Sequence, residues 1–223
     1  MKIFYAKELL NPLTSLLFLV YPSCSGKSLN AITPNHPIKD GDILVSDKAT
    51  FALGFFSPLN SKIRYVGIWY NKVSEQTIVW VAKRDTPLTN TSGVLSMDSH
   101  GNLIILETQT RNAKPIWSAK FLVQLLSTNT SGKLLDTGNF ILVHDESQNV
   151  LWQSFGYPTN TFLPYMKLGL NRKTALDRFL TSWKSPNDPG TGNFTYRIDP
   201  SGVPQFFLYK NEAPLWRVGS WTG

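Results

Sequence analysis

Apolar residues in the middle of the chain gather in short runs of four to six, each opened by a Gly-Asn pair or a similar turn. A polar loop follows each run and leads to a second short run that carries a tryptophan. Runs of this length between turn residues are typical of β-strands, and no longer stretch outside residues 1–26 shows helical periodicity. The pattern therefore predicts an all-β chain. The two clearest copies are Gly101–Leu106 with Ile116–Ser118, and Gly138–Val143 with Leu151–Ser154.

These runs recur at a nearly constant spacing. Trp80 and Trp117 are 37 positions apart (117 − 80), and Trp152 follows after 35 more (152 − 117). A weaker earlier copy covers Phe51–Phe56 and Tyr65–Tyr70. Units this short cannot each bury a core alone, so the repeat predicts three small sheets around a shared axis. The repeated tryptophans are predicted to form one central core, and their alternative role is a platform for a ligand.

The composition agrees with a folded domain. Of the 223 residues, 42% are hydrophobic and 13% aromatic, which is enough apolar material for a core and excludes wholesale disorder. The net charge is +7, but lysine and arginine are dispersed, and no run of three occurs. A nucleic-acid partner is therefore not predicted, because such binding needs basic residues clustered with aromatic ones.

Residues 1–26 resemble a secretory signal peptide, with a basic start, an apolar stretch at Leu13–Val20 and small residues before Gly26. An N-terminal membrane anchor or a packed strand is the alternative. Cys24, the single cysteine, lies in this segment. A mature chain that starts near Lys27 would therefore have no disulfide. No transmembrane segment is predicted beyond the signal peptide.

Three Asn-x-Ser/Thr triplets begin at Asn90, Asn129 and Asn193. Behind a signal peptide, such triplets predict N-glycosylation on exposed loops. We therefore expect a glycoprotein that is secreted or lies at the extracellular face of the plasma membrane.

Nothing in the sequence predicts an enzyme. The three histidines have no metal-binding spacing, no Gly-x-Ser-x-Gly elbow occurs, and no kinase motif is found. We therefore predict no catalytic residue, no metal site and no cofactor.

Several blocks taken in order resemble one family. They resemble the bulb-type (mannose-binding) lectin domain of plant G-type lectin S-receptor-like serine/threonine kinases and S-locus glycoproteins. Lys83 is a departure, because the family commonly has asparagine there. The resemblance extends from about Asn30 to Gly223. It rests on the blocks Phe51–Phe56, Tyr65–Tyr70, Val79–Asp85, Leu134–Asn139, Leu151–Thr161, Leu180–Pro186 and Asp188–Asn193.

The resemblance implies the fold and the domain boundaries. Residues 27–156 would form the lectin domain, a β-prism of three small antiparallel sheets around a pseudo-threefold axis. Residues 157–223 would form part of a β-rich S-locus glycoprotein domain. The chain ends inside that region, so we expect either a fragment or the product of a shortened gene.

The resemblance also implies a function. The chain would be a non-catalytic extracellular recognition module, the start of a receptor ectodomain that binds a glycan, a glycoprotein or a partner ectodomain. Its biology would be cell-surface perception, such as pollen recognition or defence. One alternative is a stand-alone secreted mannose-type lectin, and another is a decoy or scaffold that forms dimers and binds no ligand.

The family's mannose motif, Gln-x-Asp-x-Asn-x-Val-x-Tyr, places alternate side chains on one face of a strand. Aligned on Asn102, this chain has Asp98 and His100 in place of the glutamine and aspartate. Around Asn139 only that asparagine and an aliphatic residue match, and both copies lack the tyrosine. Asp98, His100, Asn102 and Asn139 are therefore candidate carbohydrate-binding residues, but mannose recognition of the usual kind is disfavoured. Gly-Asn pairs also serve ordinary turns, which is the alternative role.

Overall fold

The computed structural model describes residues 28–59, 61–108, 114–119, 129–201 and 204–220. The predicted signal peptide and Cys24 lie outside the described residues. The described residues form eighteen β-strands and one short 3-10 turn, η1, at Ser154–Gly156. The prediction of an all-β chain is confirmed. Within the described ranges, no helix has the length and apolar character needed to cross a membrane.

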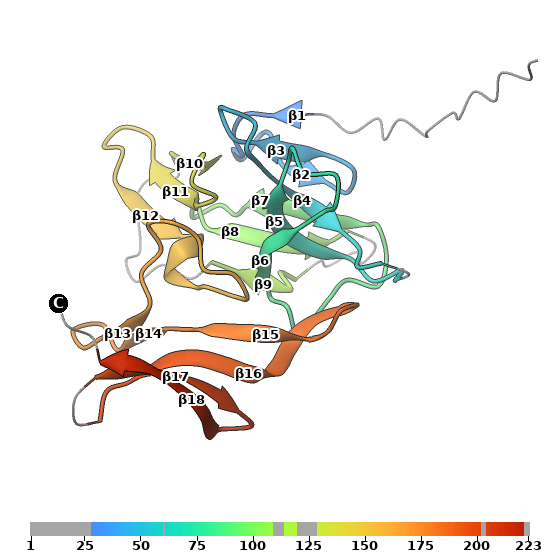
Figure 1. The fold of residues 1–223 in the computed structure, drawn as a ribbon. Coiled ribbons are helices and arrows are strands. Elements are labelled where there is room, and N and C mark those ends of the chain that lie inside the picture. Colours follow the sequence, from blue (N-terminus) through green and yellow to red (C-terminus); the bar gives the residue numbers. More distant parts are fainter. Residues whose placement is uncertain (1–27, 60, 109–113, 120–128, 202–203, 221–223) are drawn as a thin grey trace, which may run out of the picture.

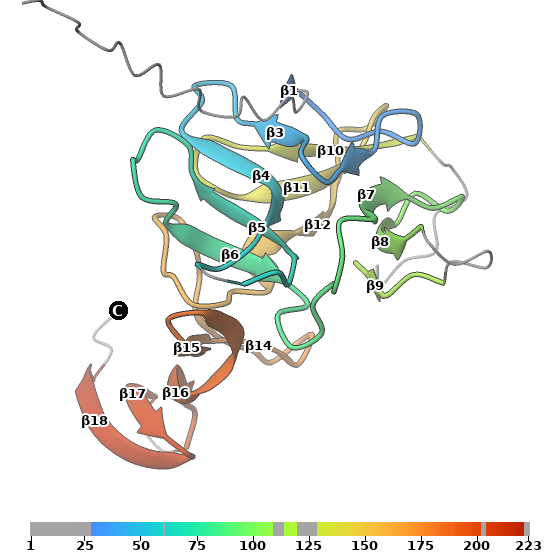
Figure 2. The same ribbon diagram turned by 90° about the vertical axis from the view of Figure 1, so that its right-hand side faces the viewer.

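Three sheets form the first part of the molecule (Figures 1 and 2). The first sheet has the order β1-β3-β4-β5-β6, the second β2-β7-β8-β9 and the third β10-β11-β12. Strands of the first sheet are β1 Ser28–Leu29, β3 Ile43–Val45, β4 Phe51–Phe56, β5 Tyr65–Tyr70 and β6 Ile78–Ala82. Strands of the second are β2 Ile38–Lys39, β7 Gly93–Met97, β8 Leu103–Glu107 and β9 Trp117–Ser118. Strands of the third are β10 Thr130–Leu134, β11 Phe140–His144 and β12 Val150–Gln153.

The repeat therefore corresponds to three small sheets, as predicted, but the sheets differ in detail. Strand β1 pairs with β3 in parallel, whereas the other pairs in the three sheets are antiparallel. Strand β2 leaves the N-terminal region and joins the second sheet, where Ile38 pairs with Leu95. The N-terminal segment thus ties the first and second sheets together, which the repeat alone did not show.

The inward faces of the three sheets share one hydrophobic core. Trp152 is 6% exposed and lies at its centre. Its ring centroid is 6.0 Å from those of both Trp80 and Trp117 and 6.4 Å from that of Phe140. All three contacts are edge-to-face, a favourable geometry for aromatic rings. The predicted central tryptophan core is confirmed.

A second β-rich segment follows η1 and lies below the three sheets in Figures 1 and 2. It contains the hairpin β13–β14 and an antiparallel four-stranded sheet in the order β15-β16-β17-β18. The predicted domain boundary between residues 156 and 157 stays a prediction. The strands are β13 Gly169–Asn171, β14 Leu176–Arg178, β15 Leu180–Ser185, β16 Asp188–Asp199, β17 Gln205–Lys210 and β18 Ala213–Ser220.

This segment packs on the outward face of the first sheet. A small second core gathers Phe56, Tyr65, Ile78 and Val81, and Trp183 of β15 packs against it. The backbone N–H of Thr181 also donates to the carbonyl of Thr159, at 2.7 Å, which joins β15 to the segment after η1. Both faces of the first sheet are therefore covered, which explains why all six residues of β4 are buried.

Candidate functional site

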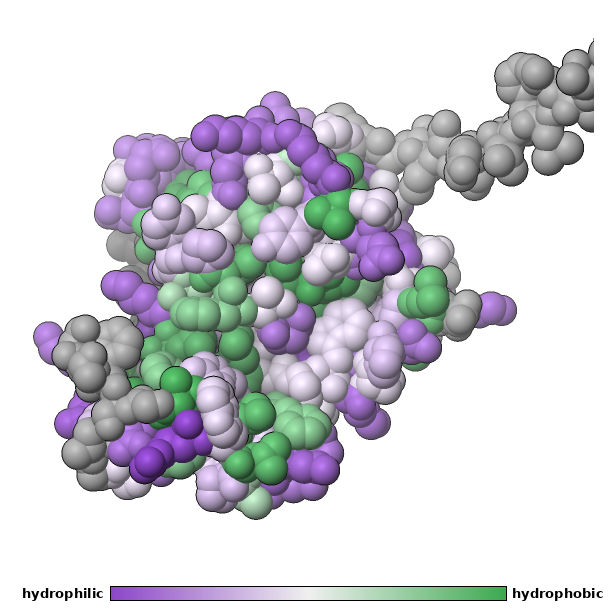
Figure 3. Space-filling model, in the orientation of Figure 1, coloured by the Kyte–Doolittle hydropathy of each residue, from purple (hydrophilic) through white to green (hydrophobic). Residues whose placement is uncertain are grey.

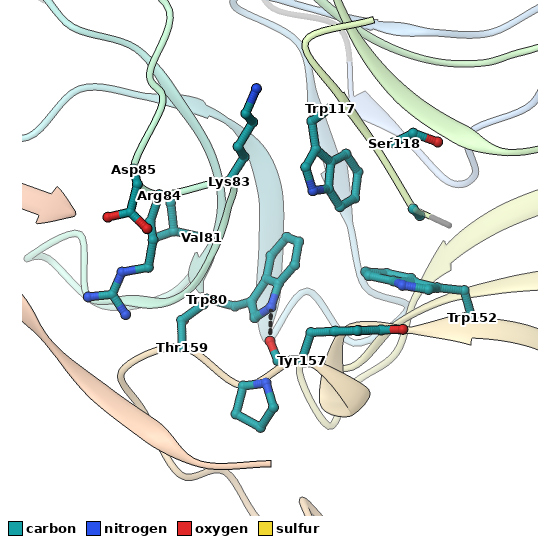
Figure 4. Close-up of a pocket in the computed structure, with 12 residues that line it drawn as sticks. Trp80, Val81, Lys83, Arg84, Asp85, Trp117, Ser118, Trp152, Tyr157 and Thr159 are labelled. Atoms are coloured by element: carbon teal, nitrogen blue, oxygen red, sulfur yellow. Dashed lines mark hydrogen bonds between the residues drawn. The ribbon is translucent and has the colours of Figure 1, made fainter. Parts of the chain in front are cut away.

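Strand β6 ends in a turn that sends three consecutive side chains in different directions. Lys83 begins the turn with φ +43°, and the N–H of Thr86 donates to its carbonyl at 3.0 Å. In Figure 4, Arg84 and Asp85 point away from the tryptophans. The Lys83 side chain extends between these two residues and Trp117. The turn therefore serves two neighbouring regions of the molecule.

Arg84 binds the β15–β16 hairpin. Its guanidinium donates to the carbonyls of Pro189 at 2.6 Å, Thr181 at 3.0 Å and Gly190 at 3.0 Å, and also to that of Ser182. The residue is only 8% exposed. Four carbonyl acceptors from two strands thus surround one buried cation, which uses most of its N–H donors. Arg84 is therefore an anchor for the hairpin.

Asp85 holds the same hairpin at its exposed side. Its carboxylate accepts the backbone N–H of Thr191 at 2.6 Å and the Thr191 hydroxyl at 2.7 Å. Partial burial opposes ionisation, but these two hydrogen bonds and the charges of Arg84 and Lys184 outweigh it and lower the pKa of Asp85. The carboxylate is thus favoured in the folded state.

The lowered pKa predicts an acid-sensitive hairpin. Asp85 stabilises the fold fully above the ordinary carboxyl value of 3.8, and this contribution is lost as the pH falls through the lower pKa of the folded state. We expect the protection of the Thr191 amide, which is its exchange rate compared with the intrinsic rate at the same pH, to fall below the folded-state pKa in the wild-type protein and to stay level in Asp85→Asn. An equal fall in protection in both proteins would contradict this role.

An aromatic cavity of about 460 Å³ opens on the other side of the turn. Its lining includes Trp80, Trp117, Trp152, Tyr157 and Lys83 (Figure 4). In Figure 3, residues of apolar or intermediate hydropathy cover the middle of one face of the molecule, and hydrophilic residues predominate around its edges. The cavity borders the central tryptophan core, because Trp80, Trp117 and Trp152 all line it.

The aromatic residues of the cavity are not equally buried. One face of the Tyr157 ring stacks on Trp152 with a centroid distance of 5.6 Å and an interplanar angle of 13°. Its side chain is nevertheless 46% exposed, and Trp117 is half-buried. The indole N–H of Trp80 donates to the Tyr157 carbonyl at 2.8 Å and fixes this residue against the core. Tyr157 and Trp117 therefore offer aromatic surface on a rigid support.

Lys83 brings a positive charge to this cavity. Its ammonium donates to the carbonyl of Ile116, just before β9, and so links the first and second sheets. An ammonium has three N–H donors, so this single bond leaves capacity for a further acceptor.

The predicted residues Asp98, His100 and Asn102 lie together in the turn between β7 and β8. The Asp98 carboxylate accepts the backbone N–H groups of His100 at 2.8 Å and of Asn102 at 2.9 Å. The Asn102 side-chain amide donates to the same carboxylate at 3.1 Å. These bonds are those of a closed turn, which supports the alternative role, and sugar contacts by these residues stay a prediction.

Asn139 lies in the turn between β10 and β11 and is 8% exposed. Its amide donates to Gln153 at 2.9 Å, and its oxygen accepts from the hydroxyl of Ser154 at 3.2 Å and the N–H of Phe155 at 3.1 Å. The side chain thus ties this turn to η1. Its role in ligand binding also stays a prediction.

The structure does not bring Asn102 and Asn139 together. They lie near opposite ends of β10: the Thr130 hydroxyl donates to the Gly101 carbonyl at 3.1 Å, whereas the Leu135 N–H donates to Asn139 at 2.9 Å. Any site at these residues would therefore be two separate sites.

The predicted glycosylation sites differ in environment. Asn129 and Asn193 are exposed, whereas Asn90 is half-buried, and its side chain bonds to Glu107 and Ser92. Glycosylation at all three stays a prediction. Among the described residues, no group of three or more His, Cys, Asp or Glu side chains could hold a metal ion.

Comparison with known proteins places this geometry in context. Residues 77–184 match the family model described as D-mannose binding lectin. The chain is 48% identical, over 87% of its length, to a G-type lectin S-receptor-like serine/threonine-protein kinase from Arabidopsis thaliana, of which it covers 23%. A second Arabidopsis thaliana kinase of the same description is 43% identical over 92% of this chain, which covers 24% of it.

The chain thus spans about a quarter of the length of these relatives. Among solved structures, the Japanese Marasmius oreades lectin aligns with 58% of this chain and 95% of its own, with a TM-score of 0.42 and 12% identity.

Proposed function

Since the chain carries a bulb-type lectin domain of the D-mannose binding family and is similar to G-type lectin S-receptor-like kinases, we propose that it recognises a glycan or a glycosylated partner at the extracellular face of the membrane. The module would be non-catalytic, and signalling would belong to a kinase outside this chain.

The aromatic cavity is the observation that carries this proposal. Lectin sites commonly join an apolar surface for the sugar ring with polar groups for its hydroxyls, and small-ligand sites are concave and partly apolar. Tyr157 and Trp117 supply the ring surface, and Lys83 supplies a donor. The cavity lies within the residues that match the lectin family model.

A glycan array tests the proposal. We expect the folded protein to bind a subset of immobilised glycans, with binding that free glycan competes and that Tyr157→Ala weakens by roughly tenfold, because one stacked ring is worth about 1 kcal/mol or more. A folded wild-type protein that binds no glycan would contradict the proposal. Lys72→Asn provides a control for a surface substitution, because Lys72 is exposed, follows β5 and does not line the cavity; it should leave glycan binding unchanged.

The array also addresses the residues that the lectin motif predicts. Loss of binding in a folded Asn102→Ala variant, with binding retained in Tyr157→Ala, would move the site to the turn between β7 and β8. Asn139→Ala needs a stability measurement beside it, because its buried hydrogen bonds make a folding defect the expected first effect.

A partner ectodomain is the second candidate ligand. Strand β18 pairs with β17 on one side and forms the edge of its sheet among the described strands. Leu215 and Trp216 on this edge are exposed. An edge strand with exposed apolar side chains favours association with another chain, so concentration-dependent sedimentation is the matching measurement.

A further inference from the structure

We propose that the aromatic cavity binds an acidic sugar, a hexuronic acid unit of a glycan, with its ring against Tyr157 and Trp117 and its carboxylate at Lys83. This inference rests on the proposed function and names the class of sugar and the residues that would select it. The site would be separate from both asparagine turns.

The ring of Tyr157 offers a surface for the sugar ring. Tyr157 has one face stacked on Trp152 and a side chain that is 46% exposed, so part of its ring surface is open to a ligand. The Trp80 hydrogen bond to its carbonyl holds the backbone in place. A platform held in this way loses little conformational freedom on binding, which favours stacking of the apolar face of a pyranose.

The charge of the cavity comes from few groups. In the described part of the chain, three charged residues line it: Lys83, Arg84 and Asp85. Arg84 is committed to four hairpin carbonyls, and both Asp85 oxygens accept hydrogen bonds from Thr191. Among the residues that the structure describes, Lys83 has one carbonyl contact, at Ile116, and so retains donors for an anion. The protein's net charge of +7 adds a weaker attraction for anionic ligands.

Lys83 has an unusual backbone conformation. Its φ of +43° lies in the left-handed region, where asparagine and glycine are favoured and a long side chain is uncommon. Such a conformation strains the backbone and is often found where a side chain has a function. The turn would be easier to form with asparagine, so the strain points to a role for the lysine ammonium.

The test compares two ligands with the same sugar backbone, one with charged carboxylates and one with neutral methyl esters. The probes are an oligomer of hexuronic acid and its fully methyl-esterified counterpart of the same length, titrated calorimetrically into the protein. We expect the acid to bind roughly tenfold more tightly, as a charge-assisted hydrogen bond provides, and the preference to shrink as salt is raised.

Three variants complete the test. Lys83→Asn should abolish the preference for the acid while the protein stays equally or more stable to heat. Lys72→Asn is the matched control, because Lys72 also donates to a backbone carbonyl, that of Lys48 at 2.9 Å, but lies outside the cavity; it should keep the preference. Tyr157→Ala should weaken binding of both probes.

The outcomes separate this inference from the proposed function. Binding of neutral glycans with no preference for the acid, or a preference that survives in Lys83→Asn, would overturn the inference and leave the proposed function standing. A folded protein that binds neither probe, nor any glycan on an array, would overturn both.

Discussion

Arg84→Ala is expected to free the β15–β18 sheet from the first sheet and to lower the free energy of unfolding by about 3–5 kcal/mol. The guanidinium donates to four carbonyls, two on β15 and two on β16, and it is almost fully buried. Its removal leaves those carbonyls beside a void, without donors, because alanine supplies neither volume nor hydrogen bonds.

Urea unfolding and limited proteolysis measure this effect. We expect the variant to be cleaved at lower protease concentration between η1 and β15, where the second segment begins. Arg197→Ala is the matched control: Arg197 is more exposed and pairs with Glu212 at 3.3 Å, so its loss should cost less than about 1 kcal/mol. Equal stability losses in the two variants would show that Arg84 is no special anchor.

Trp152→Ala is expected to lower the free energy of unfolding by about 3–5 kcal/mol. The Trp152 ring meets Trp80 and Trp117 edge-to-face, Phe140 on the third sheet, and Tyr157 beyond η1. Removing it opens a cavity at the point where all three sheets meet, and the surrounding rings belong to different sheets and cannot all move inward.

Thermal unfolding of Trp152→Ala and Trp216→Ala provides the comparison. Trp216 lies on β18 and is 59% exposed, so its truncation should change the free energy of unfolding by less than about 0.5 kcal/mol. If the two substitutions had similar effects, the three sheets would not depend on a common core.

The strands and the core were largely predictable, because turn residues and alternation act locally. The apolar runs Phe51–Phe56 and Tyr65–Tyr70 are strands β4 and β5 with the same bounds. The nearly equal spacing of the tryptophans indicated the shared core, since equivalent positions of a repeat meet at its axis. The exchange of β2 into the second sheet was not predictable, because two residues carry too little pattern to choose a partner.

The site was less predictable, because its parts are distant in sequence. Arg84 contacts residues about 100 positions away, and no local pattern indicates such partners. The lectin motif directed attention to Asn102 and Asn139, whose side chains the structure places in turn hydrogen bonds. Two local signals pointed toward the cavity: the repeated tryptophans, and Lys83 at a position where the family commonly has asparagine. The meaning of Lys83 depends on its positive φ, which sequence does not show.

The turn after β6 has a thermodynamic consequence. Lys83 reaches the cavity, and the next two residues grip the hairpin, so a single stretch of backbone belongs to both regions. If an occupant of the cavity shifts this turn, it must change the free energy with which the segment β13–β18 docks on the first sheet. Conversely, a partner that moves this segment must change the affinity of the cavity for its ligand by the same factor as the ligand changes the docking equilibrium. Reciprocal coupling of this kind would let a small molecule in the cavity change how firmly the β15–β18 sheet is docked.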